Sequence, residues 1–76
     1  MARVYLLVHV LPGRDVSIRD TLRGIKGVTH ADLVTGHYDI AAVLEAKDTA
    51  EIFDKIIKKI RKIKGIIRTE TFVAVE

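Results

Sequence analysis

Apolar residues occupy both alternating faces of a segment near the start of the chain, "RVYLLVHVL", residues 3–11. One face would carry Val4, Leu6, Val8 and Val10, and the other Tyr5, Leu7 and Leu11. Two apolar faces predict a strand that is buried on both sides. Pro12 and Gly13 follow the segment and predict a turn.

Two later segments have apolar residues at helical spacing. The first is expected to start at Asp15 or Ser17, with Asp20 as the partner of Ser17 in an acidic variant of the capping box, and to run to about residue 26, before Gly27. Its inward-facing candidates are Val16, Ile18, Leu22 and Ile25.

The second helix is expected to begin after Asp48, which acts as the N-cap with Glu51 as its capping-box partner, and to end at Gly65. Its apolar stripe consists of Ile52, Phe53, Ile56, Ile57, Ile60 and Ile63. Residues at these intervals lie on one face of a helix.

Three further strands complete the pattern. Residues 28–35 alternate between apolar and polar positions, which predicts an edge strand with one wetter face. Residues 40–46 are apolar on both faces and predict a central strand, and "IIRTETFVAV", residues 66–75, predicts the last strand.

The order strand, helix, strand, strand, helix, strand predicts one α+β domain, residues 1–76, with the ferredoxin-like βαββαβ plait. In this topology the first and third strands are central, in agreement with their two apolar faces. Both helices cover the same face of the four-stranded antiparallel sheet. The other face, with its own apolar residues, would be left open, so we expect dimerisation through the sheet, as a dimeric α+β barrel.

Composition supports self-association. Apolar residues make up 49% of a chain of only 76 residues, which is more than a small monomer easily buries. There is no bilayer-spanning run and no signal peptide in the sequence, so we expect a cytoplasmic protein. Cys, Asn, Gln and Trp are absent, whereas Ile, Lys, Arg and Glu are frequent, a bias typical of thermophile proteins.

Candidate catalytic and metal-binding chemistry is sparse. His9, His30 and His37 lie in three separate segments without helical ligand spacing, and no cysteine supplements them. Glycine-rich phosphate loops are absent, and Ser17 is the only serine. We therefore expect no catalytic residue, no metal and no cofactor.

The net charge of +3 arises largely from a basic run on the second helix, Lys55, Lys58, Lys59, Arg61, Lys62 and Lys64. Cations near a helix C-terminus are favoured by the helix dipole, and no aromatic residue is interleaved to stack on bases. We interpret the run as a solvated helix face, with any DNA binding weak and independent of sequence.

A polar cluster interrupts one of the most hydrophobic segments, "LVTGHYDIAAVL", residues 33–44. A turn explains Gly36, and the carboxylate of Asp39 at a strand end suits an α-amino group. Free turn amides can hold a carboxylate. Thr69 and Thr71 in the last strand share a face and could add hydroxyls, although threonine is also common in edge strands.

Two stretches resemble a known family. "GVTHADLVTGHYDIAAVLEAKD" and "IKGIIRTETFVAV" are similar to the RAM domain, the effector domain of the Lrp/AsnC (feast/famine) transcription regulators. The most specific parts are the G-x-Y-D turn, Gly36 to Asp39, and the G-I-x-x-T-x-T strand, Gly65 to Thr71. The resemblance covers essentially the whole chain.

The resemblance implies a βαββαβ plait whose dimers assemble into rings, commonly octamers. It implies that an amino acid or related metabolite binds between dimers, and places ligand contact on Thr35, Gly36, His37, Tyr38, Asp39, Thr69 and Thr71. Family members usually carry an N-terminal helix-turn-helix domain, whereas this chain begins at the RAM domain. Specific DNA binding is therefore not implied, and full-length regulators are a further partner class.

Two alternatives share the predicted fold. Dimeric plait proteins include small monooxygenases and haem-degrading enzymes, which use a convergent polar cavity between helices and sheet. ACT-type regulatory modules have the same strand order and also bind amino acids, but lack the G-x-Y-D pattern.

Overall fold

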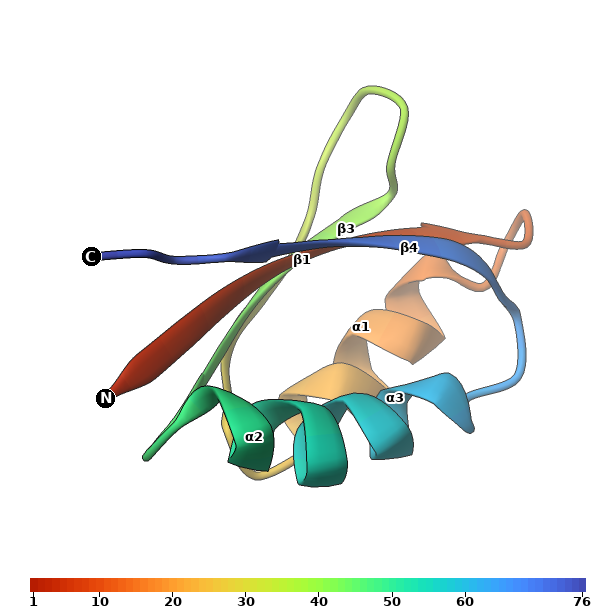
Figure 1. Ribbon diagram of the computed structural model, residues 1–76. Coiled ribbons are helices and arrows are strands. Elements are labelled where there is room, and N and C mark those ends of the chain that lie inside the picture. Colours follow the sequence, from red (N-terminus) through yellow and green to blue (C-terminus); the bar gives the residue numbers. More distant parts are fainter.

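A four-stranded antiparallel sheet with helices on one face forms the computed structural model, which describes residues 1–76 (Figure 1). Its elements are β1 (Ala2–Val10), α1 (Asp15–Arg23), β2 (Val28–Leu33), β3 (Ile40–Ala46), α2 (Thr49–Glu51), the π-helix η1 (Ile52–Ile57), α3 (Lys58–Arg61) and β4 (Ile66–Val73). The strand order is β2-β3-β1-β4. The predicted plait, with the first and third strands central, is confirmed.

The central strand β1 separates the two faces of the sheet. Val4, Leu6, Val8 and Val10 are buried toward the helices, whereas Tyr5 and Leu7 point to the open face. Paired residues of neighbouring strands share a face, so the register assigns the other side chains. Ala42 of β3 and Thr71 of β4 both pair with Leu6 and lie on the helix side, while Val43 and Phe72 pair with Tyr5.

The core lies between the helices and the inner face of the sheet. All 14 buried residues are hydrophobic. From the helices they include Ile18, Leu22, Ile52, Ile56, Ile57 and Ile60. Most of the two predicted apolar stripes is therefore confirmed, and Ile25 and Ile63 pack against the core as partly buried residues.

The prediction that Val16 and Phe53 lie in the core is wrong. Val16 is 48% exposed, because it precedes Ile18 by two positions and so points about 200° around the helix from it. Phe53 is 37% exposed. It lies in η1, where i→i+5 bonding changes the angle between successive side chains and takes Phe53 out of line with the isoleucine stripe.

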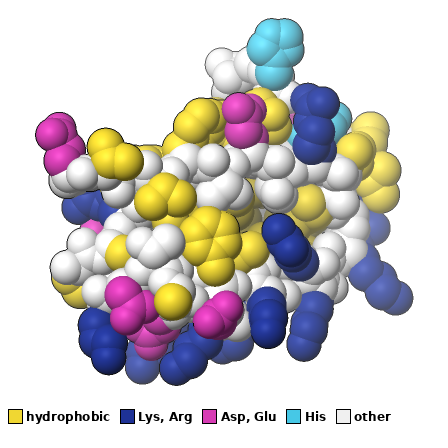
Figure 2. All heavy atoms as spheres, viewed as in Figure 1, with side chains coloured by type: hydrophobic (Ala, Val, Ile, Leu, Met, Phe, Trp, Pro, Cys, Tyr) yellow, Lys and Arg dark blue, Asp and Glu magenta, His cyan; other side chains and the backbone are white.

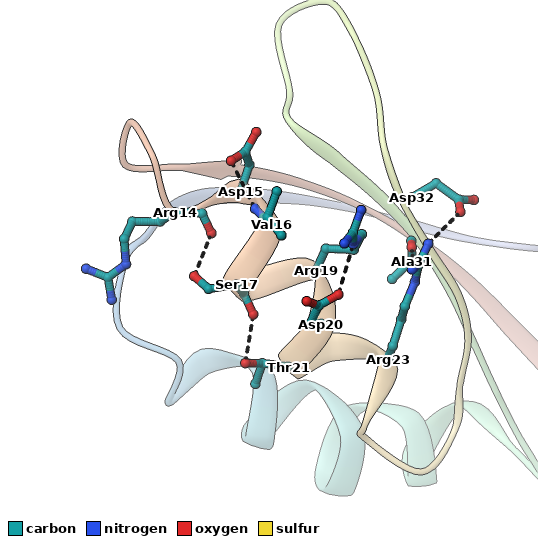
Figure 3. A network of polar contacts seen from close by, with 10 residues as sticks. All are labelled: Arg14, Asp15, Val16, Ser17, Arg19, Asp20, Thr21, Arg23, Ala31 and Asp32. Carbon is teal, nitrogen blue, oxygen red and sulfur yellow. Dashed lines mark hydrogen bonds and ion pairs between the residues drawn. The ribbon is translucent and has the colours of Figure 1, made fainter.

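Capping was predicted correctly for only one helix. Asp48 Oδ1 accepts a hydrogen bond from Glu51 N at 2.8 Å, and Glu51 Oε2 accepts one from Lys47 N at 3.2 Å. At the start of α1 the N-cap is Arg14, which makes no side-chain cap bond. Ser17 lies inside α1, two residues after its first residue, and its Oγ donates back to Arg14 O at 3.1 Å (Figure 3).

The helices end earlier than predicted. The first ends at Arg23 with Gly24 as its C-cap, and the last at Arg61 with Lys62 as its C-cap. The side chain of Arg23 also joins α1 to the sheet, because its Nε donates to Ala31 O of β2 at 2.8 Å (Figure 3). Gly27 and Gly65, which were predicted to end the helices, therefore lie in the turns after α1 and α3.

Gly27 lies where the α1–β2 turn passes against η1. Its φ is +98°, a conformation that L side chains rarely adopt. A Cβ built on Gly27 would also overlap the Cδ1 atom of Ile56. Both the backbone conformation and the space therefore favour glycine here.

We expect Gly27→Ala to lower the free energy of unfolding by about 1–3 kcal/mol, through a left-handed conformation and displacement of Ile56. Gly24→Ala is the matched control. Gly24 has φ −84°, and a Cβ there would have its nearest neighbour, Thr21 O, at 3.5 Å. Urea denaturation should show a loss for the first variant and little change for the second. Equal effects would contradict this explanation.

Candidate functional site

The open face of the sheet is a mixed apolar and polar surface that no helix covers (Figure 1). Its apolar part is formed by side chains from three strands, Tyr5, Leu7, Ala41, Val43 and Phe72. Tyr5 is 42% exposed and Phe72 is 46% exposed. The predicted uncovered sheet face is thus present, and it includes large aromatic side chains.

The turn between β2 and β3 rises from the side of the sheet opposite the helices (Figure 1). A backbone bond of 2.9 Å from Val34 N to Asp39 O closes it, and a second of 2.9 Å joins Asp39 N to Val8 O. At its tip Gly36 has φ +124°, which explains the glycine. The predicted contact residues Thr35, Gly36 and His37 are all exposed there.

Asp39 joins this turn to β1. Its Oδ2 accepts a hydrogen bond from Val10 N at 2.9 Å and lies 3.0 Å from His9 Nδ1. The Val10 amide, with a further contribution from His9, lowers the pKa of the Asp39 carboxyl below its ordinary value. The side chain is 39% exposed, so one edge of the carboxylate remains accessible.

Tyr38 reaches across β1 to the edge strand. Its hydroxyl donates to Glu70 Oε1 at 2.7 Å, and this hydrogen bond raises the pKa of Tyr38. The guanidinium carbon of Arg68 lies 5.6 Å from the centroid of the Tyr38 ring, which is within cation–π range. Tyr38 therefore connects the β2–β3 turn to β4 through two contacts.

We call the five interacting residues His9, Tyr38, Asp39, Arg68 and Glu70 the turn cluster. His9, Arg68 and Glu70 were not predicted as site residues. Arg68 pairs with His9, and Glu70 with Leu7, so all three side chains emerge on the open face. These three residues reach the turn only through the register between β1 and β4, and a single sequence does not directly indicate that register.

The two threonines lie elsewhere. Thr69 pairs with Val8 and Thr71 with Leu6, so both hydroxyls are on the helix side of β4. Their shared face is as predicted, but within one chain they lie on the opposite face of the sheet from the turn cluster. Thr69 lines a cavity of about 210 Å³ together with residues of η1 and α3, among them Ile57, Ile60 and Arg61.

Neither the turn nor the histidines form a metal centre. No group of three or more His, Cys, Asp or Glu side chains is placed to hold a metal ion. The three cavities of the chain are not lined by residues 35–39. The layer between helices and sheet buries no polar side chain, and no helix is long and apolar enough to cross a membrane.

Comparison with protein families matches residues 3–76 to the Lrp/AsnC ligand binding domain. Two similar solved structures are TTHA0845 from Thermus thermophilus, 28% identical with a TM-score of 0.92, and the hypothetical protein PHS023 from Pyrococcus horikoshii, 26% identical with a TM-score of 0.92. The matches cover 100% of this chain in both cases, and 95% and 92% of those chains. A comparison with curated protein sequences gave no match.

A third structure, FFRP-DM1, is 27% identical over 99% of this chain and 100% of its own, with a TM-score of 0.91. Escherichia coli AsnC shares the fold at 24% identity and a TM-score of 0.88, with 99% of this chain matching 51% of AsnC. The family match spans nearly every residue and agrees with the observed strand order. The chain therefore belongs to the Lrp/AsnC ligand binding domain family, a family of regulatory domains.

Proposed function

We propose that this chain is an oligomeric regulatory module that binds an amino acid or a related small metabolite at the turn cluster, between dimers. The observation that carries the proposal is the position of the cluster, on the open sheet face beside an exposed apolar surface. Its side chains are preorganised by contacts with β1 and β4. An adjoining chain would complete the site.

Unpaired polar groups on the turn fit a zwitterion. None of the backbone N–H groups of residues 35–38 donates to a backbone carbonyl, so they are available to a carboxylate. Asp39 already uses Oδ2 for Val10 and His9, while its Oδ1 makes no hydrogen bond within the chain. That oxygen can accept from an ammonium group.

A second chain also accounts for the threonines. In one chain Thr69 and Thr71 lie on the opposite face from the turn cluster, so a ligand that touches both needs two protomers. Among proteins that share the fold, NMB0573 from Neisseria meningitidis was solved as an L-Met complex, with 12% identity and a TM-score of 0.80. This complex supports an amino acid as the ligand class here.

The assembly we propose is a dimer through the apolar part of the open sheet face, with the projecting turn and its cluster at the margin of that contact, where they face the next dimer of a ring such as an octamer. Burying Tyr5, Leu7 and Phe72 in the dimer would remove the largest exposed apolar surface of the sheet. Full-length regulators of the same family are proposed as mixing partners, because about half of a protein such as AsnC is a domain with the fold of this chain.

Sedimentation equilibrium of the wild-type protein at micromolar concentration should give a dimer or a multiple of one. Leu7→Glu should reduce the mass toward that of the 8.5 kDa chain, because a charge would be placed in the apolar sheet interface. The matched control is Val16→Glu, which alters an exposed valine of α1 and should leave the mass unchanged. A stable wild-type monomer would contradict both the interface and the shared site.

Asp39→Asn should weaken binding of a responding amino acid by about tenfold or more, because a charge-assisted hydrogen bond contributes on the order of 1.5–3 kcal/mol. A thermal-shift screen of the twenty amino acids identifies the ligand, and calorimetry measures its affinity. Asp32→Asn, a matched change at an exposed carboxylate of β2, is the control and should bind normally. Unaltered affinity in Asp39→Asn would remove Asp39 from the site.

The contact of Asp39 with β1 also predicts a pH effect. Since the folded pKa lies below the ordinary 3.8, the ionised carboxylate stabilises the fold above that value, and this contribution is lost as the pH falls through the folded pKa. Asp39→Asn should therefore lower the melting temperature of the ligand-free protein at pH 7. The difference from wild type should shrink at pH 3. A constant difference would contradict this role of the charge.

A further inference from the structure

The net positive charge of the chain comes from one short segment. Residues 55–64 contain six of the 13 Lys and Arg residues and no Asp or Glu. The remaining 66 residues carry seven basic and ten acidic residues and are therefore net −3. We call the six residues Lys55, Lys58, Lys59, Arg61, Lys62 and Lys64 the basic helix face. Such segregation of charge is an electrostatic signature of an anionic partner.

The basic helix face is almost unpaired. All six side chains are exposed, and only Lys55 forms an ion pair, with Glu51 at 3.6 Å. Arginines elsewhere in the chain do find partners, as Arg3 does with Glu45 and Arg19 with Asp20. Figure 2 shows Lys and Arg side chains along the lower edge of the molecule, over the helices, with acidic side chains among them. Five of the six cations nevertheless form no ion pair within the chain.

The helix dipole explains only part of the basic helix face. Its effect falls off within the last turn, where Lys58, Lys59 and Arg61 lie. Lys55 is in η1, and Lys64 lies beyond the end of α3. The basic helix face therefore extends in both directions past the region that the dipole stabilises.

A further lysine extends the surface sideways. Lys26, from the connection between α1 and β2, lines a cavity of about 280 Å³ together with Lys55 and Lys59. Glu45 and Glu51 line the same cavity, but Glu45 bonds Arg3 and Glu51 contacts Lys55. Lys26 and Lys59 make no ion pair within the chain, so they remain available to an external anion.

The surroundings of the basic helix face narrow the class of partner. Ile52, Ile56 and Ile60 hold the opposite side of the helix in the core, so no apolar face is free to enter a lipid bilayer. Residues 55–64 include no aromatic side chain on which unpaired bases could stack. The chain has no Asn or Gln, two of the residue types that read base edges. A regular row of phosphates needs neither an apolar face nor base readout, and so fits a surface of exposed cations.

We propose that the basic helix face binds the phosphodiester backbone of duplex nucleic acid, without reading its sequence. The helical part of the face, residues 55–61, extends over about 10 Å, and a duplex presents about six charges over that length. Residues at i and i+4, such as Lys55 and Lys59, repeat along one side of the helix and can follow the backbone. The face lies on the helix layer, opposite the open sheet face, so sheet-mediated assembly leaves it accessible. The proposal does not depend on the ligand at the turn cluster.

Fluorescence anisotropy with a 20-base-pair duplex tests the proposal. With about four phosphate contacts, log K should fall against log salt with a slope of about −3.6, which is a loss of about 150-fold between 50 and 200 mM salt. Lys58→Glu should reduce the magnitude of the slope by about one contact, or about 0.9, and weaken binding at 50 mM salt by about tenfold or more. Two duplexes of unrelated sequence should bind equally within about twofold, since only phosphates are contacted.

Lys47→Glu is the matched control, because it makes the same change in net charge at an exposed lysine in the turn before α2. It should leave duplex binding nearly unchanged, and thermal unfolding of both variants checks that they fold. Equal losses in the two variants would show that net charge alone acts and would overturn the proposal. So would absence of binding at 50 mM salt, or preference for one sequence. Binding of phosphatidylserine vesicles as strong as duplex binding, and equally sensitive to Lys58→Glu, would overturn the assignment to nucleic acid.

Discussion

The pairing of β1 with both of its neighbours is the constraint on which the rest of the structure depends. Val4, Leu6 and Val8 are completely or almost completely buried against the helices, while Tyr5 and Leu7 on the same strand face the open side. A shift of one residue in either pairing would exchange these two sets. Burial of one set thus fixes the register, and the register fixes which side chains of β3 and β4 share the open face.

The turn cluster is a direct consequence of that register. Asp39 accepts the amide of Val10 at the place where the pairing of β1 with β4 is irregular, between His9 and Val10. The Val10 amide, which lies next to this irregularity in the strand pairing, thus donates to a carboxylate from the β2–β3 turn. Tyr38 then reaches Glu70 across the sheet. The turn is consequently held at two points, which orients its exposed tip.

The chain also separates its two surfaces by chemistry. The open sheet face combines aromatic and aliphatic side chains with the turn cluster, whereas residues 55–64, at the end of the second helix and just beyond it, carry six exposed cations. Because the isoleucines of η1 and α3 are buried between these surfaces, each surface can be occupied without access to the other. An oligomer built through the sheet would display the basic helix face of every protomer outward.

The sequence by itself determined the elements, their order and the sheet topology, because alternation and helical spacing are local patterns that a buried layer imposes. The Asp48 cap and the G-x-Y-D turn were also identifiable, since each needs only residues close in the chain. Sequence alone did not show that Val16 and Phe53 face outward, nor that His9, Arg68 and Glu70 meet the turn. These outcomes depend on helix rotation, the π-helical bonding of η1 and the register between strands distant in sequence. Only the tertiary structure decided that Thr69 and Thr71 lie on the opposite face of the sheet from Tyr38 and Asp39. The physical reason is that the register with β1, and the packing of β1 against the helices, determine which face of β4 points to the core.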